Sequence, residues 1–340
     1  MYLEYYGFHD HPFLMTPDAR LFFASTVHSR AHAHLVYGLS QREGFVIVTG
    51  EVGAGKTTLI ERLCAELDPT SFVVARIMTT QVSGEDLLRL VANEFHVPPE
   101  GNKADLLRGI MDTLRMGEQA GRRHVLIVDE AQALPVSALE ELRMLSNVTE
   151  NGHALLQVIL LGQPQLRRTM ASPDLDQLRQ RVLASYHLAG LSLEETRAYV
   201  EHRMRAVGWT GNPSWGPGAL ELVHRHSGGI PRRINRLCAR VLLGGALEHA
   251  SELTAEMVDV TARELEEDLS GGDTLRERGN GLPAGLGPSG YNGSYNGTAM
   301  SSGLLNDLLQ RVETLEMLTA RRERVFNRLM DLFAGGGRHL

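Results

Sequence analysis

Short apolar runs alternate with amphipathic segments through the first 190 residues of the chain. Each run lacks the strict period-two alternation of a half-exposed strand, which is typical of strands buried on both faces. The five predicted strands are 44–49, 71–77, 124–129, 155–161 and 182–188. Apolar positions at three- and four-residue spacing predict helices over 26–41, 57–67, 84–95, 103–119 and 136–145. This alternation predicts an α/β fold, a parallel sheet of about five strands with helices on both faces.

The pattern changes after Leu191. Ser192 and Glu195 have the spacing of a capping box, in which each side chain bonds the backbone N–H of the other residue, so a helix is expected to begin there. Three further helical patterns follow to about residue 269, without a strand signal. We therefore expect a core over 1–191 and an all-helical domain over 192–269.

The two ends of the chain follow neither pattern. Residues 1–26 are rich in aromatic residues and proline, and are expected to form an extended, partly buried lead-in. Residues 270–303 are crowded with Gly, Ser and Asn, which predicts a flexible linker. Apolar residues return at helical spacing over 304–334 and predict an amphipathic helix. Such a stripe fits pairing with a partner or with its own copies, and equally packing against the body of the chain.

Composition excludes several classes of protein. The 340 residues are 43% hydrophobic and 22% charged, as in ordinary soluble domains. The net charge of −7 disfavours a protein whose main role is to coat nucleic acid. No apolar run approaches the roughly 18 residues of a membrane span, and no secretory signal is visible. Cys64 and Cys238 lie in apolar helical patterns and are expected to be buried and reduced. We expect a cytoplasmic protein.

The strongest motif matches G-x-x-x-x-G-K-[ST] and lies between a predicted strand and a predicted helix, the context that this motif requires. Its glycines allow backbone N–H groups to surround phosphate oxygens, and the following helix N-terminus favours an anion. Lys56 would bind the β- and γ-phosphates of ATP, and the Thr57 hydroxyl would coordinate Mg²⁺. The residues expected to hold the nucleotide are Gly50, Glu51, Val52, Gly53, Ala54, Gly55, Lys56, Thr57 and Thr58.

A pair of carboxylates follows the third predicted strand. Asp129 ends this apolar run and Glu130 comes next. Because the carboxyl ends of parallel strands meet at one edge of a sheet, both acids are expected beside the phosphate-binding motif. Asp129 would complete the Mg²⁺ shell, and Glu130 would polarise the attacking water.

Four further polar residues are candidates. Gln163 follows the fourth predicted strand, where an amide would reach the γ-phosphate or the lytic water. Arg179 and Arg181 precede the fifth strand, and one of them would reach a nucleotide bound by a neighbouring subunit. Arg232 follows a Gly-Gly-Ile-Pro run in the first turn of a predicted helix, from which it would close on the γ-phosphate. The alternative for each arginine is a solvated helix end.

Taken together, these residues resemble the bacterial AAA+ ATPases, and more closely the secretion ATPases typified by general secretion pathway protein A (ExeA). Within that group the chain is most similar to the ATPases of PEP-CTERM/exosortase loci. The resemblance covers residues 1 to about 269. The strings that carry it include Met1-Tyr2-Leu3, Tyr5-Tyr6-Gly7-Phe8, Val128-Asp129-Glu130-Ala131-Gln132, Leu161-Gly162-Gln163-Pro164, Leu178-Arg179-Gln180-Arg181 and Ser227 to Asn235.

The resemblance assigns a role to each candidate residue. It implies a P-loop NTPase core of the AAA+ type followed by a helical lid, with Lys56 and Thr57 as Walker A and Asp129 and Glu130 as Walker B. Gln163 would be sensor 1 and Arg232 sensor 2. Arg181 or Arg179 would be the arginine finger, and residues 13–18 would lie near the adenine.

The same resemblance implies an ATPase that drives or regulates the assembly or export of cell-envelope material. It also implies a homo-oligomeric ring such as a hexamer, a protein partner bound through helix 304–334, and a location peripheral to the inner membrane only through that partner. The alternative is an ATP-dependent DNA-binding regulator similar to the AAA+ proteins of transposition. Its DNA contacts would come from the basic run Arg232, Arg233, Arg236 and Arg240, with Arg321, Arg322 and Arg324 in the tail. The acidic net charge argues against this alternative.

Overall fold

The computed structural model describes residues 2–14, 21–78, 82–98, 100–150 and 152–270. The predicted linker beyond residue 270 and the predicted amphipathic helix at 304–334 lie outside this part of the chain. Residues 15–18 of the expected adenine-side segment also lie outside it. The chain divides into a compact unit over residues 1–279 and a second unit over 280–340.

Five parallel strands form the central sheet in the order β2-β3-β6-β1-β7. They confirm the five predicted strands, with bounds that shift by one residue at most. Their bounds are β1 (Phe45–Gly50), β2 (Phe72–Met78), β3 (Arg123–Asp129), β6 (Leu156–Gly162) and β7 (Val182–Leu188). The strands β1, β3 and β6 are buried almost throughout, which explains their unbroken apolar runs.

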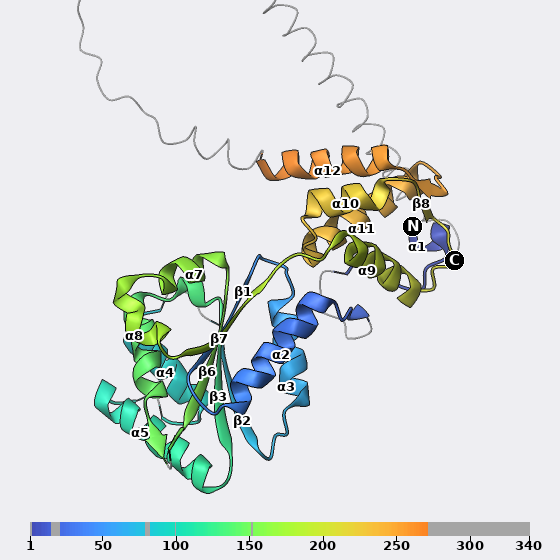
Figure 1. The fold of residues 1–340 in the computed structure, drawn as a ribbon. Helices are drawn as coiled ribbons and strands as arrows, with labels where there is room; N and C mark the ends of the chain where they lie inside the picture. Colours follow the sequence, from blue (N-terminus) through green and yellow to red (C-terminus); the bar gives the residue numbers. More distant parts are fainter. Residues whose placement is uncertain (1, 15–20, 79–81, 99, 151, 271–340) are drawn as a thin grey trace, which may run out of the picture. The chain divides into compact units, whose positions relative to one another are not determined.

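Helices cover both faces of the sheet, as predicted (Figure 1). Alternate residues of β3 divide between two hydrophobic cores because side chains in a strand point to opposite faces. Leu126 and Val128 join the core of α4, α5 and α6, whereas Val125 and Ile127 join the core of α2 and α3. The bounds are α2 (Thr26–Ser40), α3 (Lys56–Glu66), α4 (Gly84–Glu94), α5 (Lys103–Gln119) and α6 (Val136–Ser146).

A helical region, residues 192–270, follows the sheet. It contains α9 (Leu193–Ala206), α10 (Ala219–Ser227), α11 (Pro231–Leu247) and α12 (Ala255–Ser270). The predicted capping box at Ser192 and Glu195 is present at the start of α9. The region also holds a short parallel strand pair, β8 (Ser214–Trp215) and β9 (Glu252–Leu253), that the sequence pattern does not predict. The boundaries proposed at 191 and 269 stay predictions.

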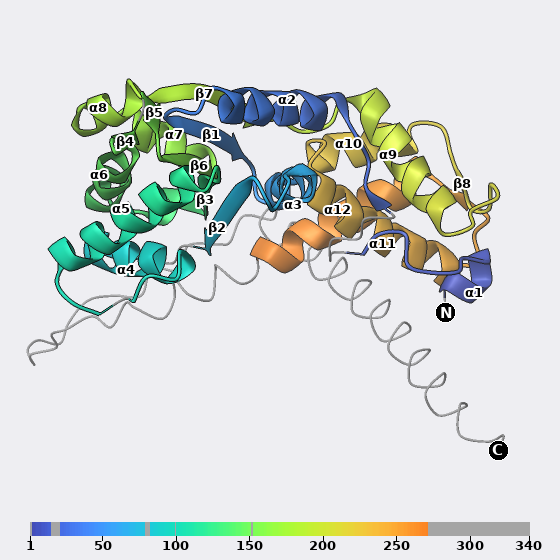
Figure 2. The same ribbon diagram turned by 90° about the horizontal axis from the view of Figure 1, so that it is seen from below.

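The N-terminal lead-in differs from the prediction of an extended segment. Residues Tyr2–Tyr6 form a short helix, α1, which contacts α11 (Figure 2). Four residues of the lead-in are buried in the same hydrophobic core as the helices of the helical region: Tyr6 of α1, Phe8, Phe13 and Leu21. The Tyr6 hydroxyl donates to the carbonyl of Ala250 at 3.1 Å. The lead-in is therefore part of the helical region's core.

Several short elements complete the described chain. They are the antiparallel pair β4 (Thr149–Glu150) and β5 (His153–Ala154), and the helices α7 (Pro164–Met170) and α8 (Asp176–Arg179). Cys238 is buried as expected, but Cys64 is only half-buried, because it lies on the edge of the α3 face that packs on the sheet. Among the described residues, no helix is both long and apolar enough to cross a membrane.

Candidate functional site

The predicted phosphate-binding residues, the two carboxylates and Gln163 gather at the carboxyl edge of the sheet, whereas the two candidate finger arginines do not. Strand β1 ends at Gly50, β3 at Asp129 and β6 at Gly162, and the three strands are neighbours in the sheet. Residues 50–57, here called the P-loop, connect β1 to the start of α3 at Lys56. This arrangement gives the P-loop the strand-to-helix context that the motif requires.

The P-loop is folded around the side chain of Lys56. Its ammonium nitrogen donates to the carbonyl of Gly50 at 2.7 Å and to that of Glu51 at 3.0 Å. Two of its three N–H donors are thus used within the loop, and no contact among the described residues occupies the third. Burial lowers the pKa of Lys56, and the negative charges of Glu130 and Asp129 oppose that shift.

The remaining P-loop residues differ in exposure. Glu51, Val52 and Thr57 are exposed, whereas Ala54 is buried and Thr58 is half-buried in the first turn of α3. Gly53 has a φ of +82°, a conformation that residues with a Cβ rarely adopt. The glycines of the loop leave backbone N–H groups accessible to an anionic ligand without Cβ clashes.

Thr57 and Asp129 place two oxygens close together beside the P-loop. The Thr57 hydroxyl donates to Asp129 Oδ2 at 3.4 Å, and the Asp129 side chain is almost fully buried. Two adjacent ligands of Mg²⁺ at about 2.1 Å lie about 3.0 Å apart, and Mg²⁺ prefers oxygen ligands, so this donor pair fits the ion. Arg76 Nη2 lies 3.5 Å from the same Asp129 oxygen and balances its charge.

Glu130 is held by two amides. Oε2 of Glu130 accepts from Gln132 Nε2 at 2.6 Å and from Gln163 Nε2 at 3.2 Å. Gln132 Oε1 in turn accepts from the Gln163 backbone N–H at 2.9 Å. The hydrogen bond from Gln132, with those of Gln163 and the charge of Lys56, holds the pKa of Glu130 below its usual value despite partial burial. Glu130 is therefore a carboxylate at neutral pH and can accept a hydrogen bond from water.

Two residues near the site were not singled out from the sequence. Gln132 has no candidate role in the sequence beyond its place in the string that resembles the AAA+ family, and His28 has none. Gln132 lies in a single turn of 3-10 helix, Ala131–Ala133, two residues after Glu130. His28 is 26 residues before its partner in the P-loop, Ala54. A polar residue in the turn after the acid pair was a usable signal for Gln132, whereas His28 is placed only by the tertiary fold.

Arg232 lies against the P-loop. Its backbone N–H donates to the carbonyl of Gly53 at 3.2 Å. A Cβ added to Gly53 would overlap the stem of the Arg232 side chain, so the two backbones approach closely. The structure thus brings Arg232 to the site, and its role as sensor 2 stays a prediction.

The other arginines of α11 proposed for DNA contact differ in their surroundings. Arg233 and Arg236 are exposed, and Arg240 Nη2 pairs with Asp268 at 3.0 Å. Part of this basic row is thus neutralised by α12. DNA binding stays a prediction that the described residues do not favour.

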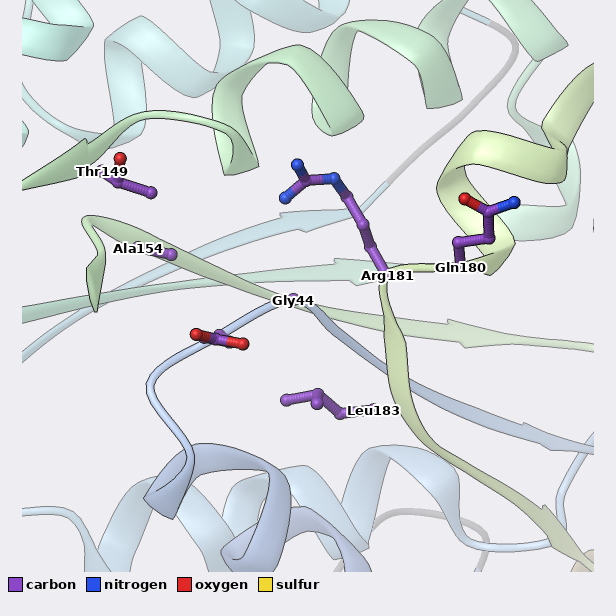
Figure 3. A pocket seen from close by; sticks show the side chains of 7 residues that line it. Gly44, Thr149, Ala154, Gln180, Arg181 and Leu183 are labelled. Carbon is purple, nitrogen blue, oxygen red and sulfur yellow. The ribbon is translucent and has the colours of Figure 1, made fainter. Parts of the chain in front are cut away.

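Arg179 and Arg181 lie at the opposite edge of the sheet from the P-loop. The carbonyl of Arg181 accepts from the N–H of Phe45, the first residue of β1, whereas the P-loop begins at the last residue. The rise of a strand separates these ends by about 17 Å. Arg181 lines a hollow of about 220 Å³ with Thr149 and Gly44 (Figure 3), and Arg179 pairs with Asp176 at 2.6 Å. Within one chain, neither arginine reaches the P-loop.

Comparison with known proteins finds a family model and a relative that match this chain. The family model of the AAA domain matches residues 39–170. Residues 39–170 are therefore similar to the AAA domains. Over 270 residues, 78% of its length, it is 39% identical to general secretion pathway protein A of Aeromonas hydrophila. The match covers 48% of that protein, so the chain spans about half the length of this relative.

Solved structures with the same fold include three archaeal proteins. The Aeropyrum pernix ORC2 protein, in ADPNP and ADP complexes, matches with a TM-score of 0.51 and 18% identity over 73% of this chain and 72% of that one. The ORC1 protein of the same organism, in complex with DNA, matches with a TM-score of 0.55 and 16% identity over 80% of this chain and 72% of that one. Cdc6p from Pyrobaculum aerophilum matches with a TM-score of 0.55 and 14% identity over 73% of this chain and 71% of that one. These matches confirm the predicted AAA+ fold and, at such identities, the fold alone.

Proposed function

We propose that this chain binds ATP with Mg²⁺ at the P-loop and hydrolyses it to ADP and phosphate. The observation that carries the proposal is the meeting of Lys56, the Thr57–Asp129 oxygen pair and the Glu130 carboxylate at one sheet edge. Lys56 and the P-loop N–H groups bind the phosphate oxygens. Thr57 and Asp129 hold Mg²⁺, which, when bound, supplies positive charge for the phosphates.

Glu130 accepts a hydrogen bond from the attacking water and orients it for in-line attack. Its lowered pKa keeps it ionised for this role. Gln132 fixes the carboxylate because it bonds both Glu130 and the backbone of Gln163. Gln163 contributes its own amide to Glu130, and in this proposal the same amide would also reach the γ-phosphate or the attacking water.

The cellular role that we propose is that of a secretion ATPase. Its support is the 39% identity with a protein named for the general secretion pathway. ATP turnover would drive or regulate the export or assembly of cell-envelope material, in an exosortase/PEP-CTERM or exopolysaccharide-linked system. Because Arg181 and Arg179 are far from the P-loop of their own chain, an arginine finger from either requires a homo-oligomer such as a ring. The predicted helix at 304–334 would bind the protein partner.

The test is the Glu130→Gln variant. An uncharged amide cannot polarise the attacking water as the carboxylate does. Turnover is therefore expected to fall at least about a hundredfold, with ATP affinity unchanged. Calorimetric ATP titration and phosphate release measure the two quantities. Glu61→Gln, an exposed position on α3, is the matched control and should behave like the parent. Normal turnover in Glu130→Gln, or normal ATP affinity in Lys56→Ala, would refute the proposal.

A further inference from the structure

His28 is a buried polar residue directly behind the P-loop. It lies in the first turn of α2 and is 8% exposed. Its Nδ1 is 2.7 Å from Ser25 Oγ, and its Nε2 is 3.0 Å from the carbonyl oxygen of Ala54. A histidine from another helix is thus bonded to the backbone of the P-loop, a contact that the nucleotide-binding motif itself does not require.

The hydrogen bonds of His28 fix its tautomer. The carbonyl of Ala54 can only accept, so Nε2 carries the proton and donates it to that oxygen. Nδ1 then accepts from the hydroxyl of Ser25, whose oxygen also accepts the backbone N–H of His28 at 3.2 Å. Burial lowers the pKa of His28, which agrees with a neutral ring. Both ring nitrogens are satisfied in this one arrangement.

The ring also fills the space behind Gly55. Gly55 has a φ of +97° and precedes Lys56, the first residue of α3. A Cβ at Gly55 would lie 2.5 Å from Nε2 of His28. The imidazole and the loop backbone are therefore in direct contact at the point where the P-loop becomes a helix.

The geometry of the peptide bond transmits this contact to the nucleotide side. In a planar trans peptide the C=O and N–H groups point in opposite directions. The hydrogen bond that turns the Ala54 carbonyl toward His28 therefore turns the Gly55 N–H away from His28. Without that bond, the Ala54–Gly55 peptide is freer to rotate, because glycine imposes little restriction.

We infer that His28 is a positioning residue for phosphate binding, which fixes the Ala54–Gly55 peptide with the Gly55 N–H directed at the phosphates. The inference rests on the proposed function and adds a residue to it. The start of α2 is itself held by the helical region, because Glu195 Oε1 accepts the backbone N–H of Thr26 at 2.7 Å. His28 therefore stands in a line of hydrogen bonds from α9 to the P-loop.

The test compares His28→Ala with His28→Gln. The glutamine side chain, unlike that of alanine, carries an amide N–H that can still donate to the Ala54 carbonyl. His28→Ala is expected to raise the KM for ATP and the Kd for ADP about tenfold and to change kcat less than about twofold, because the lost contact serves substrate and transition state alike. His28→Gln should recover most of the affinity. The matched control is His32→Ala, one turn later on α2, where the histidine pairs with Glu66 and not with the P-loop.

Each outcome decides the inference. Wild-type nucleotide affinity in His28→Ala, no recovery in His28→Gln, or an equal loss in His32→Ala would overturn it. If circular dichroism shows His28→Ala to be unfolded, Ser25→Ala carries the test, since it keeps the ring and removes the hydroxyl that orients it. Unchanged affinity in Ser25→Ala then overturns the inference. If the parent chain hydrolyses ATP and His28→Ala has the same nucleotide affinity, only this inference is refuted. If the parent chain binds no nucleotide, the proposed function is refuted as well.

Discussion

His124 makes the stability of the fold depend on pH. It is the second residue of β3, the strand that ends at Asp129, and its side chain is almost fully buried. Its ring packs edge to face on Phe95 at 5.4 Å and against the backbone of Gly117. Burial, aided by the charge of Arg122, lowers the pKa of His124 from 6.5 to about 4. The folded chain therefore holds this imidazole neutral.

The size of the effect follows from that pKa shift. The unfolded chain binds a proton at this position near pH 6.5, whereas the folded chain does so only near pH 4. Above pH 6.5 the imidazole is neutral in both states, so it does not lower the free energy of unfolding. As the pH falls toward 4, the unfolded chain binds the proton first, and the free energy of unfolding decreases progressively. The loss amounts to about 2 kcal/mol at pH 5 and about 3 kcal/mol in total.

Urea unfolding followed by circular dichroism between pH 7 and pH 4.5 measures this dependence. The free energy of unfolding of the parent should fall with pH more steeply than that of His124→Gln, by about 2 kcal/mol between pH 7 and pH 5. The substitution itself is expected to destabilise the core at every pH, so the slopes are compared and not the absolute values. His34→Gln, at an exposed position on α2, should keep the parent's slope. Parallel curves for the parent and His124→Gln would refute the reasoning.

Three further predictions concern the site. Gln132→Ala removes one of the two amides that hold the Glu130 carboxylate, so turnover should fall about tenfold or more while calorimetry gives an unchanged ADP affinity; unchanged turnover would show that this amide is dispensable. Gly53→Ala requires a left-handed alanine that also overlaps the Arg232 stem, so ADP affinity should fall at least about tenfold, and normal affinity would contradict the described loop. Arg181→Ala should lower turnover of the oligomer by about a thousandfold and leave ADP affinity unchanged, with Arg179→Ala measured in parallel. If neither variant changes turnover, no finger comes from this segment.

The sheet and the helices that cover it were predictable because each buried strand is an unbroken apolar run. The P-loop was predictable because its chemistry requires glycine, lysine and threonine at fixed spacing within a short segment. The strand ends that carry Asp129 and Gln163 follow from the same rule, since parallel strands share a carboxyl edge.

The elements that the sequence did not predict depend on contacts between distant segments. Strands β4, β5, β8 and β9 are two residues long, too short for any periodicity. The α1 helix has five residues and is held by packing on α11. The bond between His28 and Ala54 joins two elements whose approach is set by the whole of α2 packing on the sheet. Local patterns carry no trace of such pairings.

The aromatic lead-in also determines how the polypeptide can be divided in the laboratory. A recombinant fragment that starts at residue 192 would lack Tyr6, Phe8, Phe13 and Leu21, which lie in the hydrophobic core between its helices. Each such side chain is worth about 1.5–3 kcal/mol when removed from water. A truncation of this kind would expose an apolar cavity and favour aggregation. Co-expression with a peptide spanning residues 1–25 would supply the missing side chains in trans.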